Sequence, residues 1–156
     1  MTTRFDEQFL YTITDLAAIT ANGRLPMVYL HLDKGYIPCD HPCRLQGVAN
    51  MFTQENLLAA AVFYALTLDG MANKTGAKIV KRLPLGVWQD VRDGFTRYLV
   101  TPLSGEGGIQ FLCDIEDMTA PKHPAILIID LVAIRENVIQ KVEETHDKRN
   151  KSKGLK

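Results

Sequence analysis

The sequence predicts an α+β protein, a single domain of three or four helices with a small, mainly antiparallel sheet. Several stretches place apolar residues three and four positions apart, as on one face of a helix, whereas shorter stretches alternate apolar and polar residues, as in a strand. Ten apolar residues also run without interruption from Leu57 to Leu66. A chain of 156 residues is long enough to build one hydrophobic core. We expect residues 1–147 to form the globular domain and residues 148–156 to form a basic tail without regular structure.

The first helix is expected to run from Phe5 to Thr20, because apolar residues recur there at three- and four-residue steps. It should end at Asn22-Gly23, where a left-handed backbone conformation can satisfy the last carbonyl groups. Residues 27–33 then alternate apolar and polar side chains, and residues 34–37 continue through a Lys-Gly turn. This pattern predicts a short β-hairpin.

The apolar run from Leu57 to Leu66 predicts a second helix that begins after Thr53, a residue type that caps helices well. Residues 73–76 should end this helix. A helix that is apolar on every side must be buried, either in its own core or under a partner. Its ten to twelve apolar residues are too few to cross a bilayer, which needs roughly 20.

Pro84 suits the first turn of a third helix, which should end at Thr101-Pro102. The apolar face of that helix would hold Val87, Trp88, Val91, Phe95, Tyr98 and Leu99. Residues 109–115 alternate and predict a strand. Residues 125–131 fit either a second strand of that hairpin, followed by a helix, or the start of one long helix. We favour the strand, because the stretch is rich in β-branched residues and Asp130 could cap the helix that follows.

The composition argues against some classes of partner. The chain has 18 basic and 18 acidic residues, so the whole molecule exerts no long-range attraction on nucleic acid or membranes. Three cysteines, an odd and widely spaced set, indicate a reducing compartment rather than a disulfide framework. The first eight residues lack the pattern of a signal peptide, so a cytoplasmic protein is expected.

Cys39, His41 and Cys43 form the densest cluster of metal-ligand residue types. Thiolates and imidazole suit zinc, which makes these three residues candidate metal ligands. The spacing is not that of a zinc knuckle, however, and no second Cys/His pair follows at finger distance. We therefore expect a proline-bounded loop with a partly buried thiol, and no metal or other cofactor.

Cys113 is a candidate nucleophile only if His123 approaches it, since a catalytic thiol needs a base nearby. It falls on the apolar side of its strand, which favours a thiol in the core. The acidic residues around it, Asp114, Glu116, Asp117 and Asp130, could bind magnesium but are also typical of solvated turns. The glycine-rich residues 105–108 precede a strand, whereas a phosphate-binding loop follows one. No catalytic residue is predicted.

Two basic stretches could contact the phosphates of a nucleic acid. The candidate residues are Lys74, Lys78, Lys81, Arg82, Lys148, Arg149 and Lys151. The zero net charge argues against this function, and we keep nucleic-acid association as an alternative.

Residues 108–119 and 124–140, GIQFLCDIEDMT and PAILIIDLVAIRENVIQ, resemble the C-terminal half of small adaptor or chaperone subunits of type IVB (Dot/Icm-like) secretion systems. The two stretches together make up 29 of the 156 residues and include no diagnostic motif. The resemblance implies a non-enzymatic adaptor that holds segments of partner proteins and associates with other subunits.

The function that these observations favour is a cytoplasmic protein-interaction module, an adaptor or chaperone-like subunit that works in a hetero- or homo-oligomer. The all-apolar helix and the lack of a coherent catalytic constellation motivate this expectation. The alternatives are a nucleic-acid-associated regulator and a small enzyme or ligand-binding protein whose site converges only in three dimensions.

Overall fold

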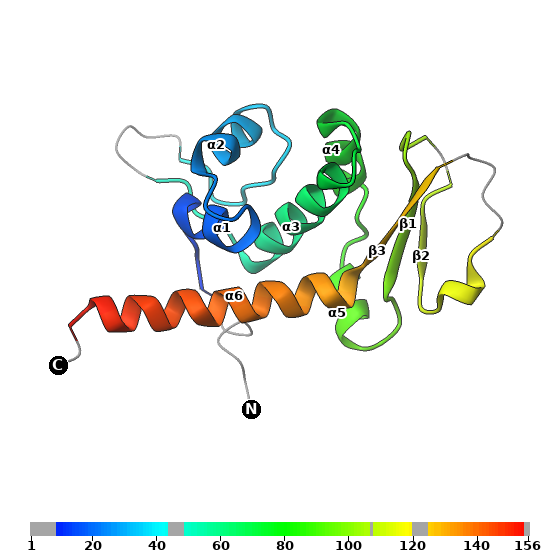
Figure 1. The fold of residues 1–156 in the computed structure, drawn as a ribbon. Helices are drawn as coiled ribbons and strands as arrows, with labels where there is room; N and C mark the ends of the chain where they lie inside the picture. Colours follow the sequence, from blue (N-terminus) through cyan, green and yellow to red (C-terminus); the bar gives the residue numbers. More distant parts are fainter. Residues whose placement is uncertain (1–8, 44–48, 107, 120–124, 155–156) are drawn as a thin grey trace. The chain divides into compact units, whose positions relative to one another are not determined.

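The computed structural model describes residues 9–43, 49–106, 108–119 and 125–154. These residues form six α-helices and three strands, which confirms the α+β class, with more helices than the three or four expected (Figure 1). The chain divides into two compact units, which we call the N-terminal unit (residues 1–61 with 135–156) and the central unit (residues 62–134).

Helix α1 of the N-terminal unit spans Ile13–Thr20. The predicted helix began at Phe5, and this prediction is wrong for residues 9–12, which the structure describes and which are not helical. The chain before α1 is extended because Tyr11 exchanges two backbone hydrogen bonds of 2.8 Å with Phe52. Thr12 then caps the helix. Its hydroxyl accepts from the backbone N–H of Asp15, and the Asp15 carboxylate accepts from the N–H of Thr12. The predicted end is confirmed, since Asn22 and Gly23 both have positive φ angles.

Residues 25–33 form helix α2 (Leu25–Asp33), so the predicted hairpin over this segment is wrong. Pro26 lies in the first turn, where its fixed φ angle favours a helix and its missing N–H costs nothing. Val28 and His31, three positions apart, are both buried, while Tyr29 and Leu30 are exposed. Burial lowers the pKa of His31, and the nearby Lys34 lowers it further. The alternation did not follow the buried face, since the apolar Leu30 is exposed while the polar His31 is buried.

Helix α3 spans Gln54–Leu68, and the expected burial of its apolar run is confirmed. Eight of the ten residues from Leu57 to Leu66 are buried. The predicted stop at residues 73–76 is wrong, because α3 ends at Leu68 and Asn73 begins helix α4 (Asn73–Lys81). Across the part of the chain that the structure describes, no helix combines the length and the apolar character needed to cross a bilayer.

In the central unit, Gly76 allows α4 to approach α3 closely. A Cβ atom at this position would lie 3.1 Å from Cγ2 of Thr67 and 3.6 Å from the ring of Phe63. The buried face of α4 consists of Gly76, Ala77, Ile79 and Val80. A residue that resembled a helix stop in the sequence is therefore a packing residue inside a helix.

The third predicted helix is much shorter than expected. Helix α5 covers only Val87–Arg92, and Gly94, with a φ angle of 82°, ends the helical path. Phe95, predicted on the buried face, is 73% exposed. Tyr98 and Leu99 belong to strand β1 (Tyr98–Pro102), which the sequence analysis missed.

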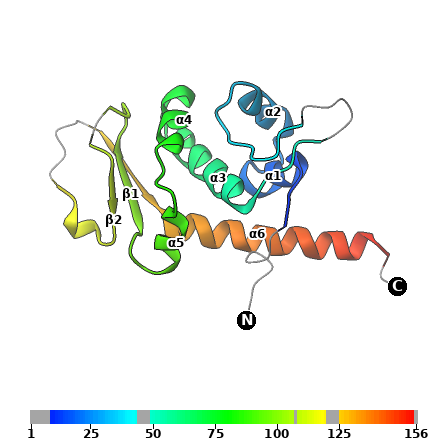
Figure 2. The same ribbon diagram turned by 180° about the vertical axis from the view of Figure 1, so that it is seen from behind.

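Strand β1 is the centre of a three-stranded antiparallel sheet of order β2-β1-β3 (Figure 2). Strand β2 (Gln110–Leu112) pairs Leu99 with Phe111, and β3 (Ile126–Asp130) pairs Leu99 with Ile129. Both strands were predicted, but β3 pairs with β1 and not with β2 as a hairpin would require. A short 3-10 helix, η2 (Ile115–Asp117), follows β2.

The strand-then-helix interpretation of residues 125–131 is confirmed. Helix α6 (Leu131–Ser152) follows β3 directly, and Oδ1 of Asp130 accepts from the N–H of Ala133 at 3.1 Å. Oδ2 of Asp130 accepts from the Arg97 guanidinium, also at 3.1 Å.

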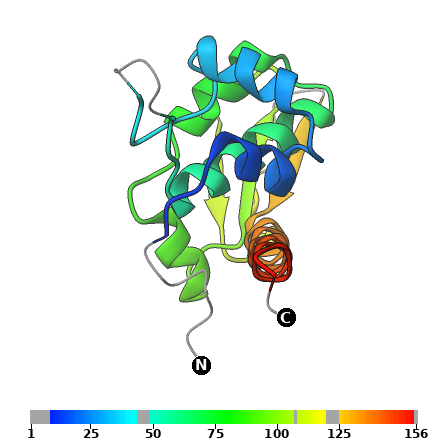
Figure 3. The same ribbon diagram turned by 90° about the vertical axis from the view of Figure 1, so that its left-hand side faces the viewer.

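In the N-terminal unit α6 continues to Ser152, so residues 148–152, expected in an irregular tail, are helical (Figure 3). The Arg149 guanidinium donates to Oδ2 of Asp15, whose side chain is only 8% exposed. This ion pair joins the last turns of α6 to the capping box of α1. A buried carboxylate needs such a partner, because an unpaired charge away from water is costly.

Substitution Arg149→Gln should reduce the free energy of unfolding by about 1 kcal/mol, since the Asp15 carboxylate loses its ionic partner while the half-exposed arginine side chain limits the cost. Urea denaturation followed by circular dichroism measures this change. The control Lys148→Gln alters an exposed neighbour and should stay within about 0.5 kcal/mol of wild type. Equal stability of the two variants would contradict the role of the ion pair.

Candidate functional site

A network of polar groups surrounds the first turn of α3 and holds a neighbouring loop. Oδ1 of Asn56, a residue that is 3% exposed, accepts from the backbone N–H groups of Thr53 and Asp40, each at 3.0 Å. The Thr53 hydroxyl accepts from the N–H of Asn56 at 3.2 Å and donates to Oδ2 of Asp40 at 3.0 Å. The predicted capping role of Thr53 is therefore confirmed, and the cap extends to a residue 13 positions earlier.

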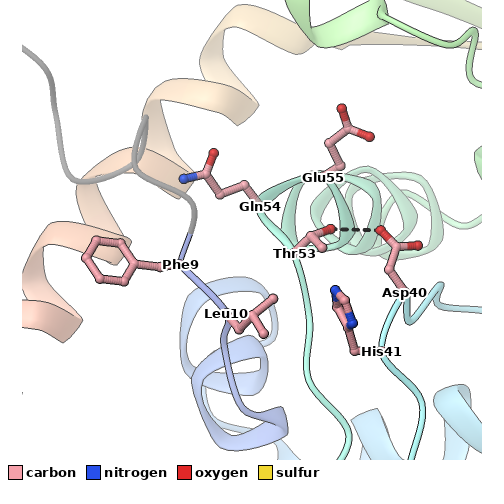
Figure 4. A pocket seen from close by; sticks show the side chains of 7 residues that line it. All are labelled: Phe9, Leu10, Asp40, His41, Thr53, Gln54 and Glu55. Atoms are coloured by element: carbon pink, nitrogen blue, oxygen red, sulfur yellow. Dashed lines mark hydrogen bonds between the residues drawn. The ribbon is translucent and has the colours of Figure 1, made fainter.

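A pocket of about 530 Å³ opens beside this network, within the N-terminal unit (Figure 4). Three segments contribute to it: the extended chain before α1, the loop at residues 40–41, and the start of α3. Its lining residues are Phe9, Leu10, Asp40, His41, Thr53, Gln54 and Glu55. The volume lies in the range of pockets that hold small ligands or single side chains of a partner.

The pocket combines an apolar edge with two carboxylates. Phe9 and Leu10 are 38% and 45% exposed, and the Phe9 ring packs against His146 with the centroids 5.0 Å apart. Asp40 and Glu55 are both exposed. Figure 4 shows Leu10 below and to one side of Thr53, and the Asp40 carboxylate and the His41 ring on the opposite side of Thr53. The arrangement can accept a cation next to an apolar contact.

Each of the three candidate metal ligands makes contacts within the N-terminal unit. Sγ of Cys39 donates to the Met51 carbonyl at 3.2 Å, and burial raises the pKa of this thiol. His41 forms an isolated β-bridge with Met51 and lines the pocket. The backbone N–H of Cys43 donates to Oδ1 of Asn50 at 2.7 Å. Nowhere in the described ranges do three Cys, His, Asp or Glu side chains gather as a metal site would require.

The candidate nucleophile of the central unit lies elsewhere than expected. Cys113 is exposed, not in the core, and its Sγ donates to the Gly94 carbonyl at 3.3 Å. The alternation failed here because β2 ends at Leu112, three residues before the predicted end of the strand, so Cys113 lies outside it. Asp114 caps the 3-10 helix η2 through the N–H of Glu116. His123, the proposed base, lies outside the described residues.

The basic candidates fall into two groups. Lys74, Lys78, Lys81 and Arg82 are all exposed, and their spacing places them along one face of α4, opposite its buried face. Lys148 and Lys151 are exposed on α6, whereas Arg149 pairs with Asp15. The first group belongs to the central unit and the second to the N-terminal unit.

No protein-family model matches the chain, and no curated protein matches it at a significant level. The pocket therefore has to be interpreted from its own residues.

Sequence reasoning missed this pocket, although it named His41 and Thr53 for other reasons. Its residues come from positions 9–10, 40–41 and 53–55, and no spacing rule links such distant segments. One signal was present in the sequence. Asn56 stands three positions after the cap Thr53, where an amide side chain can return a hydrogen bond to the cap, and its second acceptor site can hold another segment.

Substitution Asn56→Ala should reduce the free energy of unfolding by about 2 kcal/mol, because it removes a capping interaction and leaves the N–H of Asp40 without its acceptor. Chemical denaturation measures the loss, and hydrogen exchange at the Asp40 amide should become faster. The matched control Thr53→Ser keeps the capping hydroxyl and should remain within about 0.5 kcal/mol of wild type. An Asn56→Ala variant as stable as this control would contradict the role of the network.

Proposed function

We propose that the protein is a non-enzymatic interaction module, an adaptor or chaperone-like subunit of a cytoplasmic complex, which binds a segment of a partner protein in the pocket beside α3. The observation that carries this proposal is the pocket itself, which is lined by exposed apolar side chains and by two exposed carboxylates. The hydrogen bonds of Thr53 and Asn56 hold the loop at Asp40 against the start of α3. Interfaces commonly combine an apolar contact with a polar rim in this way.

The solvent exposure of the polar groups favours binding over catalysis. Asp40, His41 and Glu55 are all exposed to solvent. Enzymes usually carry out acid–base chemistry in a site that excludes water. A small enzyme remains the weaker alternative on this ground.

The apolar helix that first suggested an interaction module supports the proposal less than expected. Most of α3 is covered by the protein's own chain, so its apolar run does not require a partner. The resemblance of residues 108–119 and 124–140 to type IVB secretion adaptors is compatible with an adaptor role. Support for a protein partner therefore comes from the pocket and from the exposed side chains of Phe9 and Leu10.

A photo-crosslinking amino acid tests the proposal directly. Benzoylphenylalanine in place of Leu10 should form a covalent adduct with the same protein in repeated irradiations of the native host's cells, since position 10 lies at the pocket. The control position is Ala18, which is exposed on α1 but does not line the pocket. Mass spectrometry identifies the adducts. Identical adducts at both positions, or none at position 10, would contradict the proposal.

A second candidate function is nucleic-acid association through α4. The observation that favours it is the exposure of Lys74, Lys78, Lys81 and Arg82 along one helix face, with no acidic residue between positions 74 and 88. Leu85, just beyond this basic face, is fully exposed. Four cations on about two helical turns can contact neighbouring phosphates.

For this second candidate, the triple substitution Lys74→Gln, Lys78→Gln and Lys81→Gln should weaken binding to a fluorescein-labelled 20-nucleotide single strand. The slope of log K against log salt should fall by about 2, because three phosphate contacts are lost. Fluorescence anisotropy between low and moderate salt measures both quantities. The control neutralises Lys148, Lys151 and Lys153, which changes the net charge equally. Equal effects of the two triple variants would argue against a specific role of α4.

A further inference from the structure

We propose that the pocket beside α3 recognises an arginine side chain of its partner segment, with the guanidinium group at Asp40 and Glu55 and the methylene stem against Leu10. This inference rests on the proposed function and specifies the chemistry of the partner. It follows from three properties of the pocket: its charge, the fixed position of one carboxylate and its apolar edge.

The charge of the lining is one-sided. Asp40 and Glu55 contribute two carboxylates, and the pocket is lined by no lysine or arginine among the described residues. No cation within the described ranges pairs with either carboxylate. A ligand that enters the pocket therefore meets two acidic groups whose charge the described residues leave uncompensated, and a cation would supply the missing partner.

The Asp40 carboxylate is held in place before any ligand arrives. Its Oδ2 accepts from the Thr53 hydroxyl at 3.0 Å, and its backbone N–H is fixed by Asn56 at 3.0 Å. A carboxylate can accept about four hydrogen bonds, so the Thr53 hydroxyl leaves most of this capacity to a ligand. A positioned carboxylate suits the planar guanidinium group, whose N–H donors can bind two oxygens at once. Preorganisation of this kind reduces the entropy lost on binding.

The apolar edge suits the rest of an arginine side chain. Leu10 is 45% exposed and, in Figure 4, lies beneath Thr53 beside the polar residues. The methylene groups of arginine bury readily against such a surface while the charged end stays hydrated. Phe9 precedes Leu10 and is also exposed, so it offers a contact for an apolar residue next to the arginine.

Two other kinds of ligand fit these observations less well. A divalent cation such as Ca²⁺ takes about six to eight oxygen ligands, far more than two carboxylates supply, and a pocket of about 530 Å³ is much larger than one ion needs. A wholly apolar segment would remove water from Asp40 and Glu55 without giving either a partner, which is costly.

The test is a titration monitored by two-dimensional ¹H–¹⁵N NMR with two short probes. The first is N-acetyl-leucyl-arginine amide, and the second is N-acetyl-leucyl-citrulline amide, which has nearly the same shape but no charge. We expect the arginine probe to shift the amide signals of Leu10, His41 and Glu55 and to bind about tenfold more tightly than the citrulline probe.

Variants then separate a specific site from a general charge effect. Glu55→Gln and Asp40→Asn should each reduce the affinity for the arginine probe towards that of the citrulline probe. Glu136→Gln changes the net charge equally, at an exposed position of α6 that does not line the pocket, and should leave the affinity unchanged. Glu55 makes none of the capping hydrogen bonds, so Glu55→Gln keeps the test valid if Asp40→Asn disturbs the loop.

Equal affinity for the two probes, signal changes confined to residues outside the pocket, or an equal effect of Glu136→Gln would overturn the arginine proposal. None of these results would affect the crosslink expected from position 10, so the interaction module could stand while the arginine preference falls. Conversely, arginine binding without any crosslinked partner would leave a cation-binding pocket and remove the support for a protein partner.

Discussion

The hydrogen bonds of the Asn56 side chain are the constraint on which the N-terminal unit depends. One buried carbonyl oxygen fixes the start of α3 through Thr53 and the preceding loop through Asp40. Phe52, one residue before the cap, forms the β-bridge to Tyr11 and so positions the chain that enters α1. Three segments that are distant from one another in the sequence therefore meet at the start of α3. The pocket opens beside this helix start, where the side chains of Thr53 and Asn56 cap the first turn of α3.

The central unit depends on a different constraint, the position of β1 between two other strands. Leu99 faces Phe111 on one side and Ile129 on the other, so a shift of β1 by one residue would reverse the faces of its side chains. The helical spacing of residues 87–99 concealed this strand, because Val87 and Val91 continue a helical pattern into Phe95 and Tyr98. Gly94 was the informative residue, since its positive φ angle ends the helix and lets the chain turn into β1.

Local sequence patterns correctly predicted those helix ends that depend on a capping residue or on a glycine stop. The cap Thr53, the Asn22-Gly23 stop and the Asp130 cap were each correctly placed, and the burial of α3 followed from its composition. Short alternating segments were the weak point. The alternation of residues 27–33 predicted a strand, but the segment belongs to a helix with Pro26 in its first turn. The pocket could not be predicted, because it depends on contacts among residues 9–10, 40–41 and 53–55 and on no sequence period.

The zero net charge of the chain conceals a local separation of charge. In the N-terminal unit two carboxylates line the pocket, while in the central unit four cations share the exposed face of α4. Electrostatic recognition in salt solution acts over about 8–10 Å, so a ligand responds to the charges nearest to it and not to the average charge of the chain. The neutral total therefore argues only against long-range attraction. It leaves open two local sites of opposite sign, and a partner with a basic segment would be drawn to the first and repelled by the second.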